Sequence, residues 1–159
     1  MSKTQRIMSI LIKEIKYQDA IPIRKVVMYP LDSDNRNVCL EEDPSGTHFG
    51  LFVKESGDNN SEKLVSIVSL FLYKDPLKSN STVAQFRKFA TLQQYQNQGY
   101  GSKLLDYMIK HSQENSVDLL WCNARTSALS IYSKFSLQPC DKPYIKNNIE
   151  FVRLERKLK

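Results

Sequence analysis

The chain has 159 residues, of which 41% are apolar and 25% are charged, which is the composition of one globular domain rather than of a disordered segment. The formal net charge is +6, but the basic residues are scattered along the chain, so we expect no nucleic-acid partner. No apolar run is long enough to span a membrane, and three cysteines without paired spacing suggest neither a disulfide framework nor a metal site, so we expect a cytoplasmic protein.

The first half of the chain predicts, in order, a strand, a helix, a turn-rich segment and two strands joined by a hairpin turn. The helix follows from apolar residues at helical spacing, with Pro22 in an early turn. The two later strands alternate apolar and polar residues, and the Ser-Gly-Asp-Asn-Asn-Ser cluster between them is typical of a turn. These elements cover residues 9–16, 17–28, 30–47, 48–54 and 64–73.

The second half predicts strands that alternate with helices. A strand leads into a glycine-rich turn, and the helix after it carries Leu104, Leu105 and Met108 on one stripe. The next strand is a nearly continuous apolar run, as expected of a strand covered on both faces. A short helix follows, then a strand that Pro143 interrupts, then a last strand. These elements cover residues 83–92, 102–112, 118–123, 127–136, 137 onward and 149–158.

This order of elements predicts a mixed fold, α/β or α+β, in which helices cover both faces of one sheet. Nothing in the sequence separates a second domain, so we expect a single domain over residues 1–159.

The glycine-rich turn has the features of an anion site. Residues 96–101 read Gln-Asn-Gln-Gly-Tyr-Gly between a strand and a helix. Gly99 and Gly101 allow close approach of a ligand to the backbone, and the first N–H groups of a helix lack intrahelical partners. The helix dipole favours a phosphate at the same place. An ordinary loop-to-helix turn is the alternative reading of these residues.

Two motifs in this order resemble the GNAT superfamily of acetyl-CoA-dependent N-acetyltransferases. The first is the Gln-x-x-Gly-x-Gly loop formed by Gln96, Gly99 and Gly101. The second is residues 123–135, Asn-Ala-Arg-Thr-Ser-Ala-Leu-Ser-Ile-Tyr-Ser-Lys-Phe, which is similar to the family's Asn-x-x-Ala-x-x-Phe/Tyr-Tyr-x-Lys-x-Gly-Phe segment. The resemblance is strong over residues 86–139. It implies a GNAT-like fold with a mixed, mostly antiparallel sheet of about seven strands, splayed between the fourth and fifth strands.

The chain departs from the family pattern at two positions. Gln93 stands where a proline is common, and Ser136 stands where the family has glycine. Neither change removes a catalytic atom. Ser136 would strain the turn after the helix if a positive φ is required there.

The resemblance implies acetyl-CoA as the co-substrate and no metal. The pantetheine arm is expected to lie along the backbone of the strand before the loop, as an added strand does, and the loop N–H groups are expected to bind the pyrophosphate. Asn123 is either a ligand of the pantetheine amides or a plain turn residue, and Lys134 is either near the adenosine phosphate or solvated. The expected cofactor-binding residues are Phe89, Thr91, Gln96, Asn97, Gln98, Gly99, Tyr100, Gly101, Ser102, Asn123, Ala128 and Lys134.

The resemblance further implies direct attack of a neutral amine on the thioester, with Tyr132 as general acid for the departing thiolate. The alternative for Tyr132 is a core tyrosine on the apolar helix face. The candidate bases are Glu150 and His48. The acidic residues of the turn-rich segment and a proton path relayed by water are further alternatives. Cys122 as an acetylated nucleophile is an alternative mechanism, but its place in mid-strand favours a structural thiol.

The acceptor is expected to be a small-molecule amine or a peptide amine. The acidic stretch from Asp32 to Asp43 falls in the loop that covers the acceptor in this family, where it would attract a cationic amine; a solvated loop is the default reading of the same charges. The sequence is compatible with a monomer and with a homodimer. The alternative function is a non-catalytic module of the same fold that binds or senses acyl-CoA.

Overall fold

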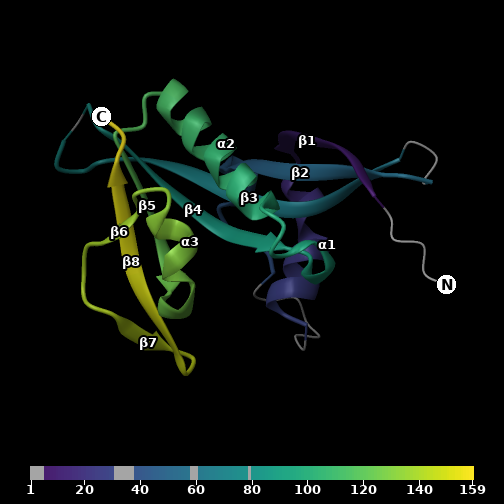
Figure 1. Cartoon of the computed structure of the whole chain (residues 1–159). Coiled ribbons are helices and arrows are strands. Elements are labelled where there is room, and N and C mark those ends of the chain that lie inside the picture. Colours follow the sequence, from purple (N-terminus) through teal and green to yellow (C-terminus); the bar gives the residue numbers. More distant parts are fainter. Residues whose placement is uncertain (1–5, 31–37, 58–60, 79) are drawn as a thin grey trace. The chain divides into compact units, whose positions relative to one another are not determined.

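The computed structural model describes residues 6–30, 38–57, 61–78 and 80–159. The chain divides into two compact units, which we call the first unit, residues 1–69 with 88–107, and the second unit, residues 70–87 with 108–159. The α-helices and strands labelled in Figure 1 are β1 (Ile7–Ile15), α1 (Tyr17–Met28), β2 (Thr47–Glu55), β3 (Glu62–Lys74), β4 (Thr82–Thr91), α2 (Tyr100–Glu114), β5 (Leu119–Arg125), α3 (Leu129–Ser133), β6 (Gln138–Pro139), β7 (Tyr144–Lys146) and β8 (Ile149–Lys157). Three short 3-10 helices, written η, lie between them: η1 (Asp43–Ser45), η2 (Gln93–Tyr95) and η3 (Thr126–Ala128).

The strands are hydrogen-bonded in the order β1-β2-β3-β4-β5-β8-β6, and β7 pairs with β8. The sheet is mostly antiparallel, with β4 and β5 parallel, so the expected fold class is confirmed. The described residues form eight strands where about seven were expected, because the segment after Pro143 forms the separate strand β7.

The parallel pairing of β4 with β5 is short. It covers Val83–Gln85 on β4 and Leu119–Trp121 on β5, although the two strands continue to Thr91 and to Arg125. The register therefore ends part way along both strands, which is what the expected splay between the fourth and fifth strands requires.

In the first unit, α1 and α2 lie on opposite faces of β2. The ring of Tyr17, on α1, lies 5.9 Å from that of His48, and the ring of Tyr107, on α2, lies 5.7 Å from that of Phe49. Because successive strand residues point to opposite faces, these two contacts place one helix on each face, as the sequence predicted. On the α1 face, Ala20 and Ile23 pack into an apolar cluster with residues of β3 and β4.

In the second unit, one face of the β5–β8 pair is packed and the other is open. Cys122 and Ala124 on β5 are buried, as are Val152 and Leu154 on β8. The segment after α3 covers this packed face, where Arg156 donates a hydrogen bond of 3.0 Å to the carbonyl of Phe135. The alternate residues of β5 and β8 point to the other face and are half-buried or exposed.

In the second unit, β7 and β8 form an antiparallel hairpin, and β8 is the last strand of the chain (Figure 1). Its turn residues, Asn147 and Asn148, have positive φ values of 52° and 62°, which is the backbone of a type I′ turn and favours asparagine. None of the helices in the described ranges has the length and apolar content that crossing a bilayer requires.

Candidate functional site

The loop before α2 presents a run of unbonded backbone donors in the first unit. Within the described residues, the N–H groups of residues 97–102 donate to no protein acceptor, and the first helical bond is from Lys103 to the carbonyl of Gly99. The φ angle is positive at Asn97 and at Gly99, with values of 61° and 83°. Positive φ at alternate residues turns successive N–H groups toward one side, which is the geometry of an anion nest.

The two glycines of this loop, Gly99 and Gly101, have different structural roles. A Cβ built on Gly99 would meet no protein atom within 4 Å, so this position faces open space. A Cβ built on Gly101 would lie 2.9 Å from Cζ of Phe89, because the start of α2 packs closely on that ring. Gly99 thus leaves room for a ligand, and Gly101 brings the helix N-terminus close to β4.

Side chains tie this loop to the surrounding strands. The Gln96 amide donates to the carbonyl of Thr91 at 2.9 Å, so Gln96 links the loop to the end of β4. The Thr91 hydroxyl lies 2.8 Å from that of Ser66 on β3. The Tyr95 hydroxyl donates to the buried carboxylate of Glu55 at the end of β2. Sequence reasoning missed the Tyr95–Glu55 contact because 40 positions separate the two residues.

Lys88 marks an irregularity in β4 that the sequence did not indicate. Its φ is 56°, a strained value for a residue with a side chain, and such strain is found preferentially at ligand sites. Its ammonium group lies 4.7 Å from the centroid of the Tyr29 ring and donates to the Tyr29 hydroxyl. Phe89 follows directly, so the strand segment expected to hold the pantetheine arm begins at this distortion.

Tyr132 belongs to the second unit and lies beside the end of the β4–β5 pairing. Its ring centroid is 6.0 Å from that of Phe86, the residue after Gln85, where the pairing with β5 stops. Burial raises the pKa of Tyr132 well above its usual value near 10, and the nearby Cys122 adds to the increase. The phenol is therefore protonated at neutral pH and can act as a hydrogen-bond donor.

Cys122 lacks the properties of a nucleophile. Its side chain is buried, and burial, with a smaller effect of Cys140, raises the pKa of its thiol to about 12. The thiolate is the reactive form of cysteine, so at neutral pH Cys122 is an unreactive thiol, as the sequence favoured.

Three expected cofactor residues also lie in the second unit. Asn123 is exposed on β5 and stands opposite Arg153 in the register with β8. Ala128 is the N-cap residue of α3, and Lys134 is its exposed C-cap residue. Their expected contacts with acetyl-CoA remain predictions.

His48 belongs to a buried polar network in the first unit. Its Nε2 lies 2.9 Å from the Asp43 carbonyl oxygen and its Nδ1 lies 2.7 Å from the Ser69 hydroxyl. Ser69 accepts a hydrogen bond of 2.9 Å from Arg24, and Arg24 pairs with both Asp43 oxygens at 2.7 and 3.0 Å. Since a carbonyl only accepts, Nε2 of His48 carries a proton in its contact with Asp43.

The charge of Asp43 is maintained within this network. Burial alone would raise the pKa of Asp43, but hydrogen bonds from Arg24 and from the Leu40 N–H outweigh it and lower the pKa below 3.8. The carboxylate is thus ionised at neutral pH and paired with a buried guanidinium. Asp43 is therefore part of the packing of α1, and of the expected acidic stretch only residues 38–43 lie within the described part of the chain.

Glu150, the other candidate base, is exposed near the start of β8 and pairs with Ile145 in the β7–β8 hairpin. His48, by contrast, is 4% exposed and has hydrogen bonds at both ring nitrogens.

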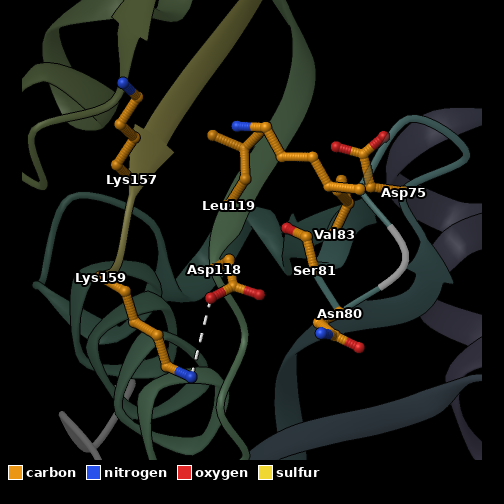
Figure 2. A pocket seen from close by; sticks show the side chains of 9 residues that line it. Asp75, Asn80, Ser81, Val83, Asp118, Leu119, Lys157 and Lys159 are labelled. Atoms are coloured by element: carbon orange, nitrogen blue, oxygen red, sulfur yellow. Dashed lines mark ion pairs between the residues drawn. The ribbon is translucent and has the colours of Figure 1, made fainter.

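A cavity of about 640 Å³ lies elsewhere in the second unit, at the start of the β4–β5 pairing (Figure 2). Val83 and Leu119, the first residues of that pairing, line it. Figure 2 shows Lys159 reaching toward Asp118, an ion pair of 3.6 Å. Tyr132 and the glycine loop do not line this cavity, so it is not the expected site of the reaction.

Comparisons with known proteins agree with this geometry. Residues 61–158 match the family described as "Acetyltransferase (GNAT) domain". YitI of Bacillus subtilis (strain 168), described as an uncharacterized N-acetyltransferase, is 29% identical over 150 residues, which cover 91% of this chain and 96% of YitI.

Solved structures share the fold. Arabidopsis thaliana NAA60 in complex with acetyl-CoA superposes with a TM-score of 0.71 at 14% identity, covering 94% of this chain and 98% of that chain. An acyl-CoA N-acyltransferase from Pseudomonas aeruginosa gives a TM-score of 0.69 at 14% identity, covering 93% and 99%. At this identity the likeness shows the fold alone.

Proposed function

The chain belongs to the GNAT family of acetyltransferases, and from this premise we propose that it transfers an acetyl group from acetyl-CoA to a primary amine. The observation that carries the proposal is the run of unbonded N–H groups at residues 97–102, with open space at Gly99. Such a loop, at the N-terminus of α2, suits the pyrophosphate of a coenzyme A thioester. The residues present therefore fit acetyl-CoA as the co-substrate.

The reaction is a direct displacement. The amine nitrogen attacks the thioester carbonyl carbon, the carbon–sulfur bond breaks, and its electron pair leaves with the sulfur. Tyr132 donates its phenolic hydrogen to that sulfur. Because burial raises the pKa of Tyr132, the phenol stabilises the thiolate by hydrogen bonding, and it transfers the proton only where burial also raises the pKa of the thiolate.

The proton lost by the amine needs an acceptor. His48 has both ring nitrogens in hydrogen bonds inside a buried network, whereas the Glu150 carboxylate is exposed. We therefore place the base at Glu150 or in a water-relayed path, and we assign His48 to the positioning of β2 against α1. A Glu150→Gln variant separates the two paths, since it slows turnover only if the carboxylate takes the proton.

Acetyl-CoA binding and turnover test the proposal together. Calorimetric titration is expected to give a micromolar dissociation constant for acetyl-CoA, with CoA as the control ligand, and release of free thiol with an amine acceptor reports turnover. Tyr132→Phe is expected to lower kcat by more than about tenfold and to leave acetyl-CoA affinity nearly unchanged, because only the donor to the leaving sulfur is lost.

Tyr107→Phe makes the same chemical change on α2 and keeps the ring contact with Phe49, so it should behave as the parent protein. Equal loss of binding and turnover in Tyr132→Phe, or loss of neither, would contradict the assignment. Binding of acetyl-CoA without thiol release for any amine would favour a non-catalytic module that binds or senses acyl-CoA.

We also propose a cytoplasmic location, because the described cysteines Cys39, Cys122 and Cys140 are all unpaired thiols. The function is compatible with a monomer and with a homodimer, which light scattering distinguishes.

A further inference from the structure

The open face of β5 and β8 in the second unit combines cationic and aromatic side chains. Along β5, Leu120, Cys122 and Ala124 are buried, while Trp121 is half-buried and Asn123 and Arg125 are exposed. A strand whose two sides differ in this way has only one face covered by the protein. The residues of the uncovered face are therefore available to a ligand.

Two arginines stand on this face with different environments. Arg125 is exposed, and within the described residues its guanidinium has no hydrogen bond or ion pair. Arg153 is held in place, because its guanidinium lies 3.9 Å from the centroid of the Trp121 ring and 3.2 Å from the Glu155 carboxylate. In the strand register Asn123 stands opposite Arg153, and Arg125 stands opposite Phe151.

These positions bring the two arginines near each other. Residues on one sheet face that are diagonal across two strands lie about 7–8 Å apart, and Arg125 and Arg153 are such a pair, with the Asn123 amide beside them. Tyr144 stacks on Phe151 at 5.9 Å and closes one end of the group. We call Arg125 and Arg153 the arginine patch.

The arginine patch lies across β5 from the proposed general acid. Tyr132 is near Cys122, on the packed face, and Asn123 is the next residue along the strand, on the open face. The pairing of β5 with β4 ends at Trp121, so beside the patch β5 has no β4 partner. With the leaving sulfur held at Tyr132, as proposed above, an amine that attacks from the open face of β5 would bring the rest of the acceptor over the patch.

We propose that the arginine patch binds a carboxylate of the acceptor, so that the acceptor is an amine that also carries a carboxylate. This inference rests on the proposed function. Arginine binds planar carboxylates through paired N–H groups. The patch is confined to two strands and has Glu155 at its edge, so it lacks the extended basic track that a nucleic acid needs.

The single tryptophan of the chain makes the patch directly observable. Because Trp121 lies under Arg153, its fluorescence emission should change when an anion reaches the guanidinium. The probes are N-acetylglycine, N-acetyl-β-alanine and 4-acetamidobutanoate, each compared with its carboxamide. These product-like pairs differ only in the carboxylate and vary its distance from the nitrogen.

At least one carboxylate is expected to give a saturable change in emission that its carboxamide does not give. Arg125→Gln should weaken that binding about tenfold or more, since it removes a charged hydrogen-bond donor, and should leave acetyl-CoA affinity unchanged. Arg6→Gln, which changes an exposed arginine directly before β1, is the matched control and should have no effect.

Equal responses to carboxylate and carboxamide, no response to any probe, or a response that survives Arg125→Gln would overturn the proposal. Displacement by RNA at lower concentration than by any carboxylate would overturn it in favour of nucleic acid. The readout needs neither acetyl-CoA nor turnover, so failure of acetyl-CoA to bind would count against the proposed function and leave the carboxylate result to stand by itself.

Discussion

Ser136 shows how much one residue type can reveal about backbone geometry. The chain has serine at position 136, where the GNAT family has glycine. We expected backbone strain at Ser136 if its φ were positive. The structure has φ at 60° for Ser136. The Leu137 N–H donates to the Tyr132 carbonyl at 3.2 Å, which is the closing bond of a Schellman turn. Glycine adopts this conformation without a Cβ penalty, and serine does not.

Ser136→Gly is therefore expected to raise the free energy of unfolding by about 1 kcal/mol, because relief of the left-handed strain outweighs the added entropy of the unfolded chain. Urea denaturation measures it. Ser130→Gly inside α3 is the control and should lower stability by about 0.5 kcal/mol, since helical φ gives glycine no advantage. A Ser136→Gly protein no more stable than the parent would contradict the account.

At the scale of elements, the glycine loop and α2 behave as one binding unit. Gly99 has φ of 83° and open space where a Cβ would be. Gly57, in the β2–β3 turn, has the same φ of 83° and the same open space. The backbone strain of a substitution is thus alike at the two glycines, and only Gly99 faces the proposed anion site.

Gly99→Ala and Gly57→Ala are each expected to cost about 1 kcal/mol of stability. Only Gly99→Ala should weaken acetyl-CoA binding, by about tenfold or more, because its methyl group keeps the pyrophosphate from the N–H groups. Calorimetric titration of both variants separates these effects. Similar acetyl-CoA affinity in the two variants would mean that the loop does not bind the pyrophosphate.

At the scale of the whole molecule, charge is distributed unevenly between surface and interior. The formal net charge is +6, yet the first unit encloses a paired Arg24 and Asp43 whose side chains are 0% and 1% exposed. Such a pair adds little net stability over an apolar pair, but removal of one partner leaves a buried charge unbalanced. The network therefore ties α1 to η1, β2 and β3 and makes the fold sensitive to the ionisation of Asp43.

Asp43→Asn is expected to lower the free energy of unfolding by about 3–5 kcal/mol at neutral pH. Because the pKa of Asp43 is lowered in the folded protein, its ionisation stabilises the fold fully above the unfolded value near 3.9, and this contribution is lost as the pH falls through the lower folded value. Urea midpoints at pH 7 and below pH 4 measure both effects. The exposed Asp141→Asn variant should differ little from the parent, and a parent-like acid response of Asp43→Asn would refute the assignment.

The sequence by itself determined the features that depend on local order. The apolar spacing of residues 17–28 predicted α1 with its observed bounds, since a helix hydrogen-bonds within its own segment. The sequence likewise predicted the glycine loop, the strand β4 before it and the helix α3 that carries Tyr132, because their geometry follows from neighbouring residues. The helix predicted over residues 127–136 is shorter than expected, since the chain enters α3 through η3 and leaves it toward the turn at Ser136.

Only the tertiary structure decided which distant side chains meet. His48 suits a base by its chemistry, yet packing of α1 against β2 and β3 places both its ring nitrogens in a buried network. The Lys88–Tyr29 contact joins residues 59 positions apart, and the arginine patch depends on the register of β5 with β8. The spacing of residues along the chain predicts neither the Lys88–Tyr29 contact nor the arginine patch. Strand register and helix docking are set by burial of the whole apolar surface, to which each residue contributes only a small part.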